Sequence, residues 1–493
     1  MKALTCTLIL AASAALGADL TIYNQNFAVV RDTVPLDLKA GVNEVRFAGV
    51  TAQVEADSVI LRDPAGKSSW QILEQSYRND PVTEALLLSL FEGQSLDFVR
   101  HEPQKPDVVV KGKIVRSGYI RSDMDADLRP GIRGMQLNTQ PIIEVDGKMI
   151  FELPGRPQFP ALGADTVLKP TLTWKLNAPA AAKLGAELAY VTNGFTWEAS
   201  YNVMQQEKGG QIDLVGWVTM KNESGSTFTD ARIKLMAGDV NKVDPNGTAG
   251  NRSRRMEISA NAIDALLADK PTVTEKTFDE FHLYTVANPT TLRDGETKQV
   301  EFVRTEGVKA ERLYIYDGAT IEGWHAGSSA GEDPDYGSQS NKKIAVFREF
   351  KNSEANKLGI PLPKGKVRFY TQDAADASLQ FVGENEVKHT PKDELVRLYV
   401  GNSFDLVGER RRTDFKVNKS NHRAEESFEI KVRNRKKEPA EVRVVEHLYR
   451  WTNWEITAKS QDFEKKDVQT IEFRVPLKPD EEKTITYKVK YTW

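Results

Sequence analysis

One short segment combines the residue types of acid–base catalysis. His389 begins the string HTPKDE, and Asp393 and Glu394 follow it closely. An imidazole beside two carboxylates can transfer protons or bind a metal. The alternative is a turn, because His-Thr-Pro bends the chain and the carboxylates can cap neighbouring amides. We expect the turn, and we keep an envelope hydrolase with a site assembled around this segment as the second hypothesis.

A second segment carries alternating carboxylates. Asp123, Asp125 and Asp127 have the spacing of a calcium-binding loop. The EF-hand pattern then requires Gly at its sixth position and Glu at its twelfth, where this chain has Leu128 and Gly134. We therefore expect a solvated acidic turn, with a loop-type calcium site as the alternative. The six histidines are scattered without a local zinc-binding pair, so no cofactor is predicted.

A third segment formally matches the G-x-S-x-G pattern of a nucleophilic serine, at 327–331 beside His325. That pattern requires a strained turn between a strand and a helix. Here it lies in a stretch rich in Gly and Ser with no helical pattern after it, so we expect a loop. The sequence contains neither a P-loop nor a dinucleotide-binding pattern.

Aromatic and basic residues gather toward the C-terminus. Tyr449, Trp451 and Trp454 could stack on sugar rings if they are exposed, but such a group is also typical of a sandwich core, which we favour. Basic runs occur at 410–412 and 431–437, with acids nearby. We expect them to form a solvated strand face, and no nucleic-acid partner is predicted.

The elements that must position these residues are predicted to be strands. At the C-terminus, apolar residues alternate with polar ones from Ile485 through Tyr487 and Val489 to Trp493. A period of two places the apolar side chains on one face of a strand. Similar short strands recur at intervals of ~10–15 residues, as in a β-sandwich.

Helix is predicted at only two places, 82–91 and 260–270. The polar stretches 239–280 and 323–343 are predicted to be loops.

Three segments share a pattern in which an apolar residue precedes a polar turn and a new strand. They are 36–45, 292–300 and 477–485. The pattern indicates either repeated sandwich modules or ordinary hairpins.

We predict a mainly β protein, with tandem immunoglobulin-like β-sandwich domains, a small inserted β module and one or two short helices. The predicted divisions, in chain order, are a signal peptide at 1–18, N-terminal sandwich strands with a short helix at 19–95, the inserted module at 96–165, a central sandwich at 166–350 with a long mobile loop at about 241–280, and a C-terminal sandwich at 351–493.

The first residues have the pattern of a secretory signal peptide. Lys2 precedes an apolar run that ends in small residues, which places cleavage near Gly17 or Ala18. A membrane anchor is the alternative. Cleavage would remove Cys6, the only cysteine, so the mature chain would have no thiol and no disulfide. We expect a periplasmic or secreted protein without an integral membrane segment after cleavage.

Several longer strings resemble a bacterial family, the domain of unknown function numbered 4139. They include AYVTNGFTWEASYNV at 189–203, GWVTMKNESGSTF at 216–228 and HTPKDELVRLYVGNSFDLVGERRRTDF at 389–415. The resemblance spans nearly all of the mature chain and implies no established activity, cofactor or catalytic residue. Some relatives are labelled mucoidy inhibitors and carry a coiled coil, but this sequence has no sustained apolar heptads.

These features together predict an exported cell-envelope protein without an assigned activity. A non-enzymatic binding or structural role is favoured, with an envelope protein or glycan as the partner. The charge balance of 67 basic and 70 acidic residues does not indicate a more specific class of partner.

Overall fold

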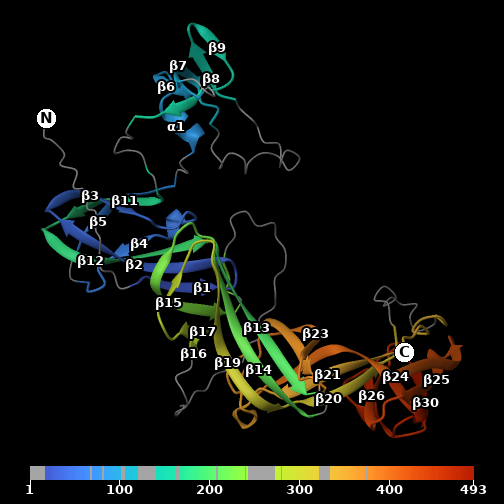
Figure 1. Ribbon diagram of the computed structural model, residues 1–493. Helices are drawn as coiled ribbons and strands as arrows, with labels where there is room; N and C mark the ends of the chain where they lie inside the picture. The colour runs from blue at the N-terminus through green and yellow to red at the C-terminus, as the bar shows by residue number, and fades with distance from the viewer. Residues whose placement is uncertain are drawn as a thin grey trace.

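The computed structural model describes residues 17–66, 69–79, 83–101, 106–119, 140–160, 167, 169–206, 209–238, 240–242, 273–278, 280–320, 333–373 and 375–493. Over these ranges β-strand is the predominant structure, with one α-helix and two short 3-10 helices, η1 (Ala56–Ser58) and η4 (Glu354–Asn356). The predicted mainly β fold is confirmed. Figure 1 shows the strands arranged in several separate sheets.

Two of these sheets pack face to face. The eight-stranded sheet has the order β16 (Val273–Phe278), β17 (Phe281–Val286), β15 (Phe228–Ala237), β1 (Asp19–Tyr23), β2 (Phe27–Leu38), β12 (Ala182–Asn193) and β4 (Ile60–Arg62), with β18 (Thr290–Leu292) paired to β15. The five-stranded sheet opposite has the order β19 (Thr297–Lys309), β14 (Gln211–Asn222), β13 (Phe195–Gln206), β22 (Gly365–Gln372) and β23 (Leu379–Val387).

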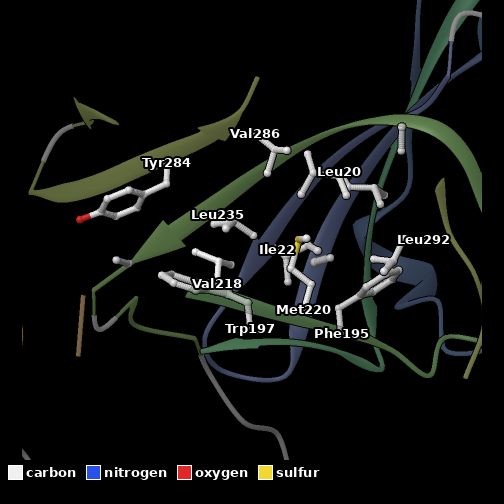
Figure 2. Close-up of a cluster of buried hydrophobic side chains, with 14 of the residues drawn as sticks. Leu20, Ile22, Phe195, Trp197, Val218, Met220, Leu235, Tyr284, Val286 and Leu292 are labelled. Carbon is white, nitrogen blue, oxygen red and sulfur yellow. The ribbon is translucent and has the colours of Figure 1, made fainter. Parts of the chain in front are cut away.

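The main core lies between these two sheets. Figure 2 shows Leu20 and Ile22 of β1 and Leu235 of β15 pointing toward Trp197 of β13 and Met220 of β14. All five side chains are buried. This is the packing that strand alternation predicts, because every second side chain of each strand faces the opposite sheet.

A three-stranded sheet extends the same core. Its order is β3 (Gly41–Ala48), β11 (Thr171–Ala178) and β5 (Gln71–Arg78). Trp174 and Leu176 of β11 are fully buried in this core. Trp174 also donates a hydrogen bond from Nε1 to Oε1 of Gln75 on β5 at 2.8 Å, which satisfies its one polar group.

The C-terminal region has a core of its own. A nine-stranded sheet has the order β27 (Trp454–Lys459), β30 (Glu482–Thr492), β25 (Arg423–Asn434), β24 (Leu395–Asn418), β21 (Lys343–Lys351), β20 (Glu311–Asp317), β26 (Ala440–His447), β29 (Thr470–Leu477) and β28 (Glu464–Lys465). The predicted C-terminal strand is β30, and its Ile485, Tyr487 and Val489 are buried there. The immunoglobulin-like topology stays a prediction.

A small β module carries the α-helix. Its sheet has the order β10 (Arg156–Gln158), β6 (Ser95–Arg100), β7 (Val108–Arg116), β8 (Ile142–Val145) and β9 (Lys148–Ile150). Thr83 is the N-cap of helix α1 (Glu84–Leu90), and its Oγ1 accepts a hydrogen bond from the N–H of Leu86. Leu88 of α1 packs in the core of this module. Figure 1 shows the module standing apart from the other sheets.

Several elements differ from the predicted domain divisions. Strands β22 and β23, expected in the C-terminal sandwich, belong to the five-stranded sheet because β22 pairs with β13. The helix expected at 82–91 is present as α1, but Leu88 packs with the module and not with the N-terminal strands. Strands β20 and β21, expected in the central sandwich, belong to the nine-stranded sheet because β21 pairs with β24 and β20 with β26. The helix predicted at 260–270 lies outside the described residues.

The chain repeats one pattern of four strands. In each copy, the first and second strands do not pair with each other. The third strand pairs with the second, and the fourth strand pairs with the first. The copies are β2-β3-β11-β12, β14-β15-β18-β19, β21-β22-β23-β24 and β25-β26-β29-β30. The three similar segments at 36–45, 292–300 and 477–485 connect unpaired strands of these copies. They are therefore corners of the repeated pattern and not hairpins.

Candidate functional site

A cavity of about 740 Å³ opens where the turn between β1 and β2 approaches β13, β22 and β23. We call it the polar groove, and it is lined by Asn24, Gln25, Trp197, Glu198, Lys364, Gly365, Lys366, Glu384, Asn385, Glu386 and His389. Its volume falls in the range of ~300–1,000 Å³ that is usual for ligand sites.

Ion pairs between neighbouring strands line one side of the polar groove. Lys364 Nζ lies 3.0 Å from Glu386 Oε1, and Lys366 Nζ lies 3.9 Å from Glu384 Oε1. The four side chains are 49–59% exposed, so each ion pair contributes little to stability, about 0–1 kcal/mol. These charged groups are consequently available to exchange partners with a ligand. Glu198 adds an exposed carboxylate on β13.

Two buried tyrosines fix the segment that leads into β22. Tyr201 donates from Oη to the carbonyl of Pro363 at 2.6 Å, and Tyr284 donates to the carbonyl of Pro361 at 3.0 Å. Burial raises the pKa of both hydroxyls well above the ordinary tyrosine value. They remain protonated donors at any physiological pH, so this wall of the polar groove is held in place before a ligand arrives.

Trp197 forms the base of the polar groove without offering its ring face. Its side chain is only 4% exposed, and Nε1 donates to the carbonyl of Met236 at 3.1 Å. The ring also packs against Tyr284, with 6.2 Å between the ring centroids. Recognition in the polar groove must therefore depend on hydrogen bonds and charge rather than on stacking against this indole.

His389 is the member of the predicted HTPKDE site that reaches the polar groove. The backbone N–H of Lys364 donates to His389 Nδ1 at 3.2 Å. A neutral imidazole that accepts at Nδ1 carries its proton on Nε2. Leu362 and Thr390 exchange two backbone hydrogen bonds of 2.8 and 2.9 Å, which hold the histidine beside the start of β22.

Asp393 and Glu394 lie in a different environment from His389. Both are exposed in a turn, and neither lines the polar groove. The N–H of Asp393 donates to the carbonyl of Asn352 at 2.7 Å, and the N–H of Asn352 donates to the carbonyl of Glu394 at 2.9 Å. Asn352 is fully buried, and its Nδ2 donates to two further carbonyls, those of Ile360 and Pro391. We call this arrangement an asparagine corner.

The same asparagine corner occurs twice more. Asn222 and Asn434 are fully buried, and each donates from Nδ2 to two backbone carbonyls at 2.8–3.1 Å. Their N–H groups donate to the carbonyls of Glu296 and Glu481, as that of Asn352 does to Glu394. In every corner the residue before this glutamate has a positive φ of 56–71° (Gly295, Asp393 and Asp480). Residues 393–394 thus have the same structural role as two other corners of the chain.

A second group of charged residues is buried, and one of them, Arg410, belongs to a basic run expected on a solvated strand face. Arg410 contacts both oxygens of Glu446 from Nε at 3.0 Å, and Arg450 lies 2.9 Å from Glu426, with all four side chains 0% exposed. The expectation of a solvated run at 410–412 is therefore wrong for Arg410. Its burial follows from strand alternation, since Arg410 pairs with Ile430, a core residue of β25.

These buried guanidinium groups hold a neighbouring segment. Arg410 donates from Nη1 to the carbonyl of Gly337 at 2.9 Å, and Arg450 donates to the carbonyls of Asp333 and Tyr336 at 2.8 and 3.0 Å. The segment 333–337 is thereby fixed against the C-terminal core. We assign the cluster a structural role, because each guanidinium group is paired with a carboxylate of the same chain.

The aromatic residues predicted as a sandwich core, with sugar stacking as the alternative, do not share one environment. Tyr449 donates to Glu426 at 3.2 Å within the buried cluster. Trp451 is 44% exposed and packs at 6.3 Å from Trp493. Trp454 is partly buried and packs on the C-terminal core. For all three rings to stack on a sugar, Tyr449 would have to break its hydrogen bond to Glu426.

Other predicted sites fall outside the described residues. These are the carboxylates Asp123, Asp125 and Asp127, and the G-x-S-x-G match at 327–331. Within the described part of the chain, no group of three or more His, Cys, Asp or Glu side chains could hold a metal ion. In the same part, no helix has the length and apolar character needed to cross a bilayer.

Comparison with known proteins gives one family. The family model described as "Domain of unknown function (DUF4139)" matches residues 186–493, well over half of the chain. The matched region includes β13, β22 and β23 of the polar groove and all three asparagine corners. No curated protein matches the chain.

Proposed function

We propose that this chain, which belongs to the DUF4139 family, is an exported cell-envelope protein that binds a ligand in the polar groove and does not transform it. The lining of the groove is the observation that carries the proposal. It combines three glutamates, two lysines and three amide side chains on a framework of paired strands. Such a surface offers hydrogen-bond donors and acceptors side by side.

The lining favours a neutral or zwitterionic glycan as the ligand. Acids and bases are close to balance, so a strongly charged ligand would gain little from the groove. Hydroxyl and acetamido groups of a glycan can both donate and accept, as the amides of Asn24, Gln25 and Asn385 also can. The lining contains no Ser, Thr or Cys nucleophile, which supports binding over acyl transfer through a covalent intermediate on such a residue.

Export is the part of the proposal that depends on the first residues. The apolar run that ends near Gly17 supports secretion, and an envelope glycan would then be accessible to the mature chain. Fractionation of cells that express the tagged full chain tests this directly. We expect a shortened chain in the periplasm or medium; a full-length chain in the cytoplasm or membrane would contradict export.

Binding is tested with fragments of an envelope glycan as the probe. Muropeptides released from purified peptidoglycan carry sugar hydroxyls, acetamido groups and both signs of charge. We expect saturable binding to the purified mature protein by isothermal titration calorimetry, with the fragments recovered unchanged by mass spectrometry. Turnover of the fragments would contradict the non-enzymatic role, and the absence of binding would contradict this class of ligand.

A further inference from the structure

A second cavity, of about 180 Å³, lies where the five-stranded sheet meets the nine-stranded sheet. We call it the junction pocket. Its charged lining residues are Arg312 on β20, Arg348 on β21, and Lys436 in the connection between β25 and β26. No Asp or Glu lines it, which distinguishes it from the balanced polar groove. The two cavities share no lining residue.

Arg348 is a buried cation whose described partners are all neutral. Its side chain is 1% exposed, and Nε donates to Gln205 Oε1 at 2.7 Å. Nη1 donates to the carbonyls of Gly209 and Ala310, while the buried Nη2 has no hydrogen-bond partner. Burial lowers the pKa of Arg348 to about 10, and the positive charge of Arg312 adds to this effect. A buried charge of this kind normally has an anionic partner.

The second cation lies directly opposite the first. Arg312 and Arg348 are partners in the antiparallel β20–β21 ladder, so their side chains leave the sheet on the same face. Like charges at such positions destabilise a sheet. The next pair on that face, Tyr314 and Val346, also lines the junction pocket, so the two ladder pairs form one continuous wall.

The third cation is positioned by this wall. Lys436 donates from Nζ to Tyr314 Oη at 2.7 Å and lies 4.8 Å from the centre of that ring. Its acidic neighbour, Glu438 at 3.1 Å, is not part of the lining. Thr371, which accepts from Gln205 at 2.9 Å, adds a hydroxyl from the opposite sheet. The junction pocket thus combines positive charge from the nine-stranded sheet with polar side chains from the five-stranded sheet.

We propose that the junction pocket binds the phosphate group of inorganic phosphate or of a small phosphomonoester. Arg348 is buried, its Nη2 has no hydrogen-bond partner, and Arg312 and Lys436 add positive charge to the same lining. This arrangement calls for an anion, and the charge of about −1.5 to −2 on a phosphate monoester at pH 7 offsets more positive charge than a carboxylate does. Guanidinium groups match phosphate geometry well. The small volume leaves little room for more than the phosphate and a short attached group.

Titration of the full chain with inorganic phosphate, at fixed ionic strength and in a buffer without other oxyanions, tests the site. We expect saturable binding that Arg312→Gln weakens about tenfold or more, because a charge-assisted hydrogen bond is lost. Arg304→Gln is the matched control: it removes an exposed arginine of β19 that pairs with Glu301 at 2.6 Å. It should bind phosphate as the unmodified protein does.

Thermal unfolding shows whether a weakened variant is folded. Without phosphate, a cooperative melting transition of Arg312→Gln shows that the variant is folded. Phosphate should raise the melting temperature of the unmodified protein and of Arg304→Gln, but not that of Arg312→Gln. Failure of the unmodified protein to bind phosphate, or equal binding by a folded Arg312→Gln, would overturn the proposal.

Two further ligands test whether the junction pocket instead binds a carboxylate or a lipid headgroup. Acetate at the same concentration tests a carboxylate, and we expect weaker binding than for phosphate. Phosphatidylglycerol vesicles test a lipid headgroup, and we expect no sedimentation that depends on Arg312. Tighter binding of acetate, or Arg312-dependent vesicle binding without binding of free phosphate, would overturn the assignment to a small phosphate.

Discussion

The asparagine corner makes a quantitative prediction, and Asn434→Ala is its simplest perturbation. Asn434 is fully buried, its Nδ2 donates to the carbonyls of Glu438 and Lys478, and its Oδ1 accepts from the N–H of Lys436 at 2.9 Å. The substitution removes all three hydrogen bonds and leaves these two carbonyls and this N–H without their side-chain partner. At about 0.5–1.5 kcal/mol for each bond, we expect a loss of about 2–4 kcal/mol in the free energy of unfolding.

The assay must report the unfolding of each of the two large cores separately, because a chain with several cores need not unfold in one step. Urea unfolding followed by hydrogen exchange and mass spectrometry reports each core by its own peptides. Asn434→Ala should destabilise peptides of β25, β26 and β30. Asn222→Ala and Asn352→Ala should destabilise peptides of the main core by a similar amount. Asn402→Ala, at an exposed position of β24, is the control and should have little effect.

Two results would refute this reasoning. One is a loss below about 0.5 kcal/mol for all three corner variants, which is the ordinary range for surface changes. The other is an equal loss for Asn402→Ala. Either result would mean that the hydrogen bonds of the asparagine corner do not stabilise the corners of the repeated strand pattern.

Three other measurements follow from the same geometry. Glu446→Ala should cost about 3–5 kcal/mol by leaving Arg410 buried without its partner, whereas the double variant Arg410→Met, Glu446→Leu should cost less; equal costs by thermal unfolding would contradict the ion-pair account. The hydrogen bond that His447 donates from Nε2 to Asp317 raises the pKa of His447. This pair therefore stabilises the fold fully below pH ~6.5 and loses that contribution as the pH rises through the raised pKa of the folded state. Asp317→Asn should flatten this part of the curve of melting temperature against pH, and an unchanged slope would contradict the assignment. Tyr201→Phe should leave a buried carbonyl unsatisfied, lower stability by about 1–3 kcal/mol and weaken muropeptide binding; unchanged binding would show that the wall it supports is not part of the ligand site.

The strand content could be predicted from the sequence because burial on one face leaves a period of two. The alternation from Ile485 to Tyr491 appears in the structure as the buried face of β30. The divisions between domains were less predictable, since β20 and β21 pair with strands distant in the sequence, β26 and β24. Local patterns contain no information about such pairing.

The polar groove could be anticipated only in part. The sequence placed His389 in a turn, and the structure shows this turn beside the groove. The complementary charges of Lys364 and Lys366 with Glu386 and Glu384 are visible as KGK and ENE strings, but their contact depends on the register of β22 and β23. A sequence alone does not give that register.

The burial of Arg410 could not be predicted from the basic run in which it lies. Arg410, Arg411 and Arg412 form a continuous basic run, yet the side chain of Arg411 is 66% exposed while that of Arg410 is 0% exposed. Strand alternation could have suggested that neighbours face opposite sides. The depth of burial of Arg410 depends on Glu446, which lies on β26.

The central claim is that the polar groove binds a ligand, and Glu198→Gln tests it most directly. This variant keeps the shape of an exposed groove side chain and removes its charge. Glu306→Gln, at an exposed position of β19 in the same sheet, is the matched control. In calorimetric titrations with muropeptides, we predict that Glu198→Gln weakens binding about tenfold while Glu306→Gln binds as the unmodified protein does. Equal affinities for all three proteins would contradict the claim.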